Sequence, residues 1–204
     1  FSDSRKFSAS TEHGGMGVWP SGCWTPQISP HPMNNRTFLW ITSWDAARYR
    51  RQRRRLFQLG VSLSQIGRIT ERVSRPVNMN WAWASTTTEF VGFVDDDADL
   101  GDRPFLAPME AMLETHPVIG MVIMPTVQVG EKGCLTKTPD LPVTASAQDA
   151  ALPVTTLTTL GCCLLRRSVP VRFDEAYFWS QVFDRDFGRD VAFHGWQVVA
   201  DRRF

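Results

Sequence analysis

Short apolar runs recur along most of the chain and are separated by segments of helical periodicity. The runs are rich in β-branched and aromatic residues and have the length of buried strands. The clearest of them, Glu89–Val94, leads directly into a row of aspartates. The runs that we predict to be strands are Thr37–Ser43, Ile66–Thr70, Glu89–Val94, Val118–Met124, Leu157–Leu165 and Gln197–Ala200.

The segments between the runs predict helices. Ala46–Leu59 is rich in helix-favouring residues, with Asp45 as an N-cap and Gly60 as the residue that ends the helix. Arg75-Pro76 is expected to be extended, because proline disfavours a helical residue before it. Further helical segments are predicted around Trp81–Ala84, over Phe105, Met109, Met112 and Leu113 up to His116-Pro117, and over Ala176–His194 up to Gly195.

This alternation predicts an α/β sandwich with a central, mostly parallel sheet flanked by helices. Ligands of such sheets bind beyond the carboxyl ends of the strands. Residues 1–35 are rich in Ser, Gly, Pro and His without a sustained period, so we expect an irregular N-terminal arm before a domain at 36–204. Within the domain, residues 126–153 predict a long loop of the kind that often serves function.

Composition excludes several classes of protein. The 22 basic and 21 acidic residues nearly balance, so no nucleic-acid partner is expected. No apolar run approaches the roughly 20 residues of a membrane-spanning helix. The four cysteines contain no CxxC pair, which argues against a zinc ribbon and favours small buried residues in a reducing compartment. We expect a cytoplasmic protein, with contact to a membrane surface as an open alternative.

One helix carries a dense arginine run. The run consists of Arg48, Arg50, Arg51, Arg53, Arg54 and Arg55. A nucleic-acid or nuclear-signal interpretation is available, but the overall charge balance favours a solvated helix face. Some of these residues remain candidates for contact with an anionic acceptor or a membrane surface.

Four aspartates follow the clearest strand. They are Asp95, Asp96, Asp97 and Asp99, and adjacent carboxylates repel one another unless a cation or hydrogen-bond donors offset their charge. At a strand end they could hold Mg²⁺ or Mn²⁺ with phosphate oxygens as co-ligands, or form a solvated acidic turn. An EF-hand is excluded because Leu100 and Leu106 stand where its glycine and final acid belong. A phosphatase-type motif is also excluded, because it needs a threonine or valine where Asp99 stands.

The aspartates belong to a larger pattern that resembles the family 2 glycosyltransferases, which have a GT-A fold. Asn80 lies fifteen residues before Asp95, with Ala84 and Glu89 between them, as in that family's N-x-x-x-A…E-F-V-x-F-V-D-x-D segment. Two later blocks are also similar, and the resemblance covers about residues 37–200. They are Gly161 with Arg166-Arg167 and Phe173–Glu175, and the segment Phe183–Gly195.

The resemblance implies a metal-dependent, inverting sugar transfer. The donor would be a UDP-, GDP- or dTDP-sugar and the acceptor a carbohydrate or other hydroxyl compound. Donor binding would fall to Asn80, Asp95 and Asp96, and binding of Mn²⁺ or Mg²⁺ to Asp97. Asp184 would be the general base, with its role as a helix N-cap as the alternative. Supporting or acceptor-side roles would fall to Asp186, Arg189, His194 and Trp179, although Asp186 and Arg189 also suit an i,i+3 pair.

The chain departs from the family pattern in two places. Phe183 replaces the glutamate before the base, and Asp190 stands at the family's arginine. The family also begins with a strand that ends in a nucleotide-binding loop, and if Thr37–Ser43 is the second strand, only Met16–Pro20 remains for the first. Met16–Pro20 matches poorly, so we expect the first strand to be degenerate or missing. Two alternatives therefore stay open: a weakly active or inactive GT-A-like binding module, and a nucleotidyltransferase, which should show a Gly-rich or basic phosphate loop.

Overall fold

The computed structural model describes residues 36–70, 74–124, 128–129, 135–136, 151–153, 160–177 and 182–201. The predicted arm at 1–35 lies outside these residues. The helices are α1 (Ala46–Gln58), α2 (Arg75–Ser85), α3 (Leu106–Thr115) and α4 (Val182–Phe193), with a short 3₁₀ turn, η1 (Leu63–Gln65). The strands are β1 (Thr37–Thr42), β2 (Ile66–Ile69), β3 (Phe90–Asp95), β4 (Ile119–Ile123), β5 (Gln128–Val129), β6 (Leu135–Thr136), β7 (Ala151–Pro153), β8 (Cys162–Arg166) and β9 (Gln197–Asp201).

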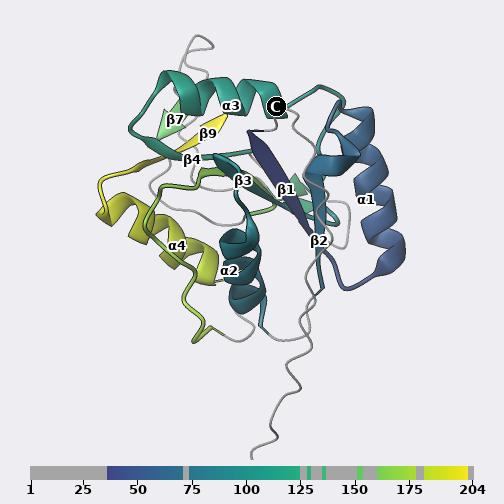
Figure 1. The fold of residues 1–204 in the computed structure, drawn as a ribbon, viewed down its shortest axis with the longest axis horizontal. Coiled ribbons are helices and arrows are strands. Elements are labelled where there is room, and N and C mark those ends of the chain that lie inside the picture. The colour runs from purple at the N-terminus through teal and green to yellow at the C-terminus, as the bar shows by residue number, and fades with distance from the viewer. Residues whose placement is uncertain are drawn as a thin grey trace, which may run out of the picture. The chain divides into compact units, whose positions relative to one another are not determined.

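Seven strands form one sheet in the order β2-β1-β3-β8-β4-β9-β7 (Figure 1). β1 pairs parallel with β2 and β3, and β4 pairs parallel with β9. β8 is antiparallel to both β3 and β4, and β7 is antiparallel to β9. Five strands therefore run in one direction, which confirms the mostly parallel sheet. A separate antiparallel pair joins β5 to β6.

Alternate residues of the central strands face two helix layers. In β3, Val91 and Phe93 belong to the apolar cluster that includes residues of α2 and α4, whereas Phe90 and Val94 belong to the cluster with α1 and α3. Side chains of a strand alternate between the two faces of a sheet, so a strand covered on both faces needs an uninterrupted apolar run. Figure 1 shows the strands lying between these helices.

Aromatic residues form the centre of the α2/α4 layer. The rings of Phe173 and Phe187 stack with centroids 4.0 Å apart, and both meet Trp83 edge-on. Phe93 of β3 contacts Phe173 edge-on as well. Phe173 therefore anchors the segment that follows β8 in the core, and α4 packs on the same cluster.

Several local predictions differ from the structure. The segment Arg75-Pro76 is not extended: α2 begins there, because Ser74 caps the helix and Pro76 occupies a first-turn position that needs no backbone N–H. Residues 126–153 do not form one long loop, since β5, β6 and β7 lie within them. Ala176 lies in a turn rather than starting α4, which is helical from Val182 onwards.

No helix among the described residues is both long and apolar enough to cross a lipid bilayer.

Candidate active site

Three parallel strands end at one edge of the sheet, and polar side chains gather there. Asp95 is the last residue of β3 and stands in register with Thr42, the last residue of β1. The antiparallel strand β8 begins at this edge, where the Asp95 amide donates a hydrogen bond to the Gly161 carbonyl at 2.8 Å. Residues from the ends of β1 and β3 and from the start of β8 therefore lie together at this edge.

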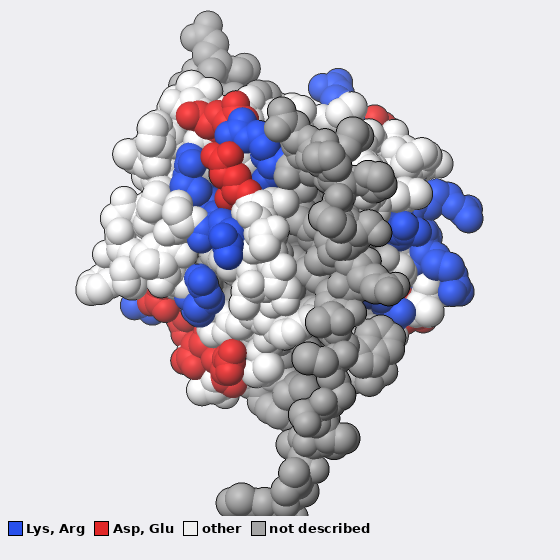
Figure 2. Space-filling view, in the orientation of Figure 1, with Lys and Arg blue, Asp and Glu red and all other residues white. Residues whose placement is uncertain are grey.

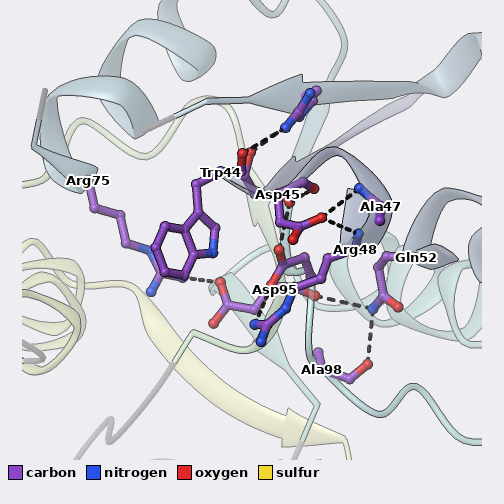
Figure 3. A network of polar contacts seen from close by, with 11 residues as sticks. Trp44, Asp45, Ala47, Arg48, Gln52, Arg75, Asp95 and Ala98 are labelled. Atoms are coloured by element: carbon purple, nitrogen blue, oxygen red, sulfur yellow. Dashed lines mark hydrogen bonds and ion pairs between the residues drawn. The ribbon is translucent and has the colours of Figure 1, made fainter. Parts of the chain in front are cut away.

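Asp95 is held by two polar neighbours from different helices. Arg75, at the start of α2, forms an ion pair with the Asp95 carboxylate, and Figure 3 shows the two side chains reaching toward each other. Gln52 of α1 donates to the Asp95 carbonyl at 3.2 Å and to the Ala98 carbonyl at 2.9 Å. Burial raises the pKa of Asp95 to about 7, against the lowering effect of Arg75 and with the help of the nearby carboxylates, Asp184 foremost among them.

Asp184 is the second buried carboxyl group at this edge. It is the third helical residue of α4 and only 4% exposed. Its Oδ2 accepts a hydrogen bond from the Leu160 amide at 3.2 Å, while its Oδ1 is buried and accepts none from the described residues. Burial raises the pKa of Asp184 to about 6, opposed by the positive charge of Arg75 and by the Leu160 hydrogen bond. Because Asp184 lies inside the helix and bonds to another segment, it is not the N-cap of α4.

The other three aspartates after β3 have different surroundings. Asp96 is buried, accepts a hydrogen bond from the Ser43 hydroxyl at 2.6 Å and lies 3.8 Å from an Arg48 nitrogen. Asp99 accepts a hydrogen bond from the Gly101 amide at 3.0 Å and so closes a turn. Asp97 is exposed. Of the predicted donor and metal ligands in this row, Asp96 is therefore tied to the β1–α1 connection, and Asp97 faces solvent.

The donor set suits a hard divalent ion that also binds phosphate. No group of three or more His, Cys, Asp or Glu side chains is placed to hold a metal among the described residues. Mg²⁺ commonly takes only one or two protein carboxylates, with substrate phosphates and water completing its coordination. Exposed Asp97 and neighbouring Asp95 fit that limited role, and their oxygen ligands match the preference of Mg²⁺ and Mn²⁺.

Asn80 is hydrogen-bonded to the segment that follows β8. Its amide nitrogen donates to the Phe173 carbonyl at 2.8 Å and to a Glu175 oxygen at 2.9 Å, and its oxygen accepts from the Phe173 amide at 2.9 Å. These three hydrogen bonds join α2 to the segment after β8. Asn80, which the resemblance predicts to bind the donor, therefore connects α2 to Phe173–Glu175, and we call these three hydrogen bonds the Asn80 clamp.

The predicted supporting residues of α4 do not gather at the site. The Tyr177 hydroxyl donates to Asp186, and Arg189 lies 3.8 Å from Asp186 in the i,i+3 arrangement. His194 follows the last turn of α4, with its Nδ1 2.8 Å from the Asp190 carbonyl. Because α4 leads into the start of β9, which is parallel to β3, His194 lies at the opposite edge of the sheet from Asp95. Trp179 lies outside the described residues.

Sequence reasoning missed two residues at this edge. Arg75 interacts with both buried carboxyl groups, although it stands twenty positions before Asp95 and carries no motif of its own. Trp44 follows β1 and is 73% exposed, and in Figure 3 its indole lies on the Arg75 side of the network. Arg68 donates to the carbonyls of Ser43 and Trp44, each at 3.2 Å, and so fixes the backbone there. The signal for Trp44 was its place directly after a buried strand.

The sheet leaves no position between β1 and β3 for an additional strand. β1 is hydrogen-bonded directly to β3 on one side and to β2 on the other. The residues that follow β1 contact Asp96 through Ser43. β1 is therefore the strand that ends beside the aspartates, next to β3. The segment Met16–Pro20 lies outside the described residues.

Known proteins similar to this chain are found by comparing structures. No described family and no curated protein matches the sequence. The crystal structure of S. aureus TarS 1–349 in complex with UDP matches with a TM-score of 0.55 and 12% identity over 80% of this chain and 57% of that chain. A197 from STIV matches with a TM-score of 0.52 and 13% identity over 81% of each chain.

These likenesses concern the fold. This chain spans little more than half of TarS 1–349, which is a GT-A-type glycosyltransferase, and 34% of the longer TarS chain. The TM-scores of 0.55 and 0.52 indicate a shared architecture, and identities of 12–13% leave the membership of family 2 as a resemblance in sequence. The helix-flanked, mostly parallel sheet and its structural neighbours together define a GT-A-like α/β fold.

Proposed function

We propose that this chain transfers a sugar from a nucleoside-diphosphate donor to a hydroxyl acceptor, with a divalent metal ion and inversion at the anomeric carbon. The observation that carries the proposal is the meeting of Asp95, Asp184 and Arg75 at the carboxyl edge of the sheet, next to exposed Asp97. Buried carboxyl groups with raised pKa values beside a cation are typical of functional sites. The UDP-bound structural neighbour supports a nucleotide as the ligand.

In this proposal the row after β3 faces the donor diphosphate. Asp97 and Asp95 would hold Mg²⁺ or Mn²⁺, which when bound would offset the charge that develops on the leaving diphosphate. Arg68 fixes the backbone of Ser43 and Trp44, and the exposed indole of Trp44 offers a face on which a base or sugar can stack.

Asp184 would act on the acceptor. A pKa of about 6 keeps its carboxylate mostly ionised at neutral pH, and its buried Oδ1 accepts no hydrogen bond from the described residues. The acceptor oxygen forms a bond to the anomeric carbon while the bond from that carbon to the diphosphate oxygen breaks. The acceptor proton passes to Asp184, and the bonding electron pair leaves with the nucleoside diphosphate.

A binding module without catalysis is the second candidate. Asp95 is paired with Arg75, and Asp96 is hydrogen-bonded to Ser43. Of these three adjacent carboxylates, Asp97 is the exposed one. A site of this kind could bind a nucleotide with little contribution from a metal. A nucleotidyltransferase remains the third alternative, as it did from sequence.

Titration calorimetry separates the two candidates. UDP, GDP and dTDP are titrated into the protein with and without Mn²⁺, and we expect one of them to bind at least tenfold more tightly with the metal, because the ion bridges carboxylate and diphosphate. Asp97→Asn should remove this gain, whereas Asp99→Asn, the same charge change two positions on, should keep it. Equal affinity with and without Mn²⁺ would favour the binding module.

A further inference from the structure

The outer face of α1 is rich in arginine. Between Ala46 and Thr70 the chain has seven arginines and no acidic residue. Two of the arginines of α1 pair with carboxylates of other elements: Arg48 lies near Asp96, and Arg55 forms an ion pair with Asp102. Figure 2 shows Lys and Arg side chains gathered on the flank where Figure 1 places α1.

The helix has a distinct inner and outer side. Gln52 and Leu56 are buried against the sheet. Residues about half a turn away in helical angle point outward, and these are Arg50, Arg54 and Phe57, with Arg51 beside them. Arg50, Arg51 and Arg54 are exposed and have no carboxylate within ion-pair distance among the described residues. We define this set of Arg50, Arg51, Arg54 and Phe57 as the basic face.

Exposed apolar side chains accompany the arginines. Phe57 is 56% exposed and Leu63, just beyond the end of the helix in η1, is 41% exposed. Single apolar residues on a protein surface are normal, and Leu63 lies in η1 rather than on the helix, so these two side chains alone do not indicate a binding surface. A cluster of about four to eight basic residues on an amphipathic helix is typical of segments that bind anionic lipid headgroups, and α1 has six arginines with Phe57 on its exposed side. The phosphates of a nucleic acid would bind the same positive charge, so duplex DNA is the competing ligand in the test below.

We propose that the basic face binds the surface of an anionic lipid bilayer. The chain as a whole carries a formal charge of only +1, so attraction to an anionic surface must come from a local patch such as this one. The helix is about 20 Å long at 1.5 Å per residue. The helix adjoins the Asp95 edge at Gln52, which bonds to the Asp95 carbonyl. The basic face lies on the opposite side of α1 from Gln52, so bound headgroups would lie across the helix from Asp95.

Vesicle flotation tests this inference without any sugar donor. The full chain is mixed with vesicles of phosphatidylcholine alone or of phosphatidylcholine with phosphatidylglycerol. We expect binding to the anionic vesicles only, weakening as salt is raised because the contacts are exposed. At about 1 kcal/mol for each arginine near the surface, Arg50→Gln with Arg54→Gln should lower the partition coefficient about thirtyfold.

Matched variants distinguish the basic face from general charge. Arg167→Gln with Arg185→Gln makes the same charge change at other exposed positions and should bind as the wild type does. Phe57→Ser should weaken binding, whereas Phe193→Ser, at an 87% exposed phenylalanine elsewhere, should not. Equal losses in both arginine pairs, no binding to anionic vesicles, or binding to duplex DNA in preference to vesicles would overturn the inference. The donor-binding titration is independent of all these outcomes.

Discussion

Asp184 and Asp190 lie on the same helix, and only one of them is buried beside the ion pair of Arg75 with Asp95. If Asp184 removes the acceptor proton, Asp184→Asn should lower turnover by roughly 10²–10⁴-fold, the usual contribution of a positioned general base. Donor affinity should stay unchanged, because the carboxylate acts on the acceptor. The measurement is the initial rate of nucleoside diphosphate release at saturating acceptor, together with calorimetry of donor binding.

Asp190→Asn is the control for this experiment. It makes the same substitution at an exposed position of α4 and should leave both quantities at wild-type values. Turnover of Asp184→Asn within about threefold of the wild type would remove this residue from the mechanism. A loss of folding in a thermal melt would instead indicate that the buried carboxyl group serves structure.

The row of aspartates shows how far residue types in a sequence can predict a site. The edge of the sheet on which the row lies could be predicted, because a buried strand ends there. The separate surroundings of its members could not, since neighbouring residues leave a strand in different directions. Asp95 meets Arg75 while Asp96 meets Ser43. The ion pair of Arg75 with Asp95 could not be predicted, because only the folded chain brings the start of α2 to the end of β3.

At the scale of elements, the Asn80 clamp offers a test of a predicted donor ligand. Asn80→Ala removes three hydrogen bonds between α2 and the backbone and side chain of Phe173–Glu175. Leaving buried backbone groups unpaired costs about 1–3 kcal/mol each at most, so we expect the free energy of unfolding to fall by about 2 kcal/mol. Nucleotide affinity should change little. Chemical denaturation and calorimetry on the same variant measure both effects.

Asn78→Ala serves as the matched control in α2. The Asn78 side chain bonds only to the Ser74 carbonyl of its own helix in the described residues, at 3.0 Å. Its removal should therefore cost less than the loss of the Asn80 clamp. A large loss of nucleotide affinity with unchanged stability in Asn80→Ala would support the donor-binding role that the sequence pattern predicted.

Element types were more predictable than element directions. The strands β1, β3 and β4 were predicted to within about a residue of their ends, because each is a short apolar run that the fold buries. The reversal of β8 between β3 and β4 could not be predicted, since apolar periodicity carries no information about strand direction. The start of α2 at Arg75-Pro76 was also missed, because the same proline suits either an extended segment or a first helical turn.

At the scale of the whole molecule, the buried carboxyl groups predict how stability changes with pH. The pKa of Asp95 is raised to about 7 in the folded chain, against about 3.9 when unfolded. The folded state therefore binds more protons in this window, and the contribution of Asp95 to the free energy of unfolding falls as pH rises from about 4 to 7. The steepest slope for a single group is about 1.4 kcal/mol per pH unit.

The variant Asp95→Asn isolates this contribution from those of other groups. It cannot ionise at this position, so its free energy of unfolding, measured by denaturant titration across the same pH window, should lack the part of the decline due to Asp95 and keep the part due to Asp184. The wild type should lose stability relative to the variant as pH rises. A difference between the two proteins that is constant with pH, or that changes in the opposite direction, would contradict the raised pKa of Asp95.

The hydrogen bond from Leu160 to Asp184 gives the site a built-in spectroscopic reporter. The amide proton of Leu160 points at the carboxylate oxygen Oδ2, 3.2 Å from its nitrogen. Its NMR chemical shift should therefore follow the charge on Asp184, with a midpoint at the group's pKa of about 6. Residue-specific nitrogen labelling would make this one resonance readable in the absence of donor, acceptor and metal. The ionisation of the proposed base would then be observable before any substrate of this protein is identified.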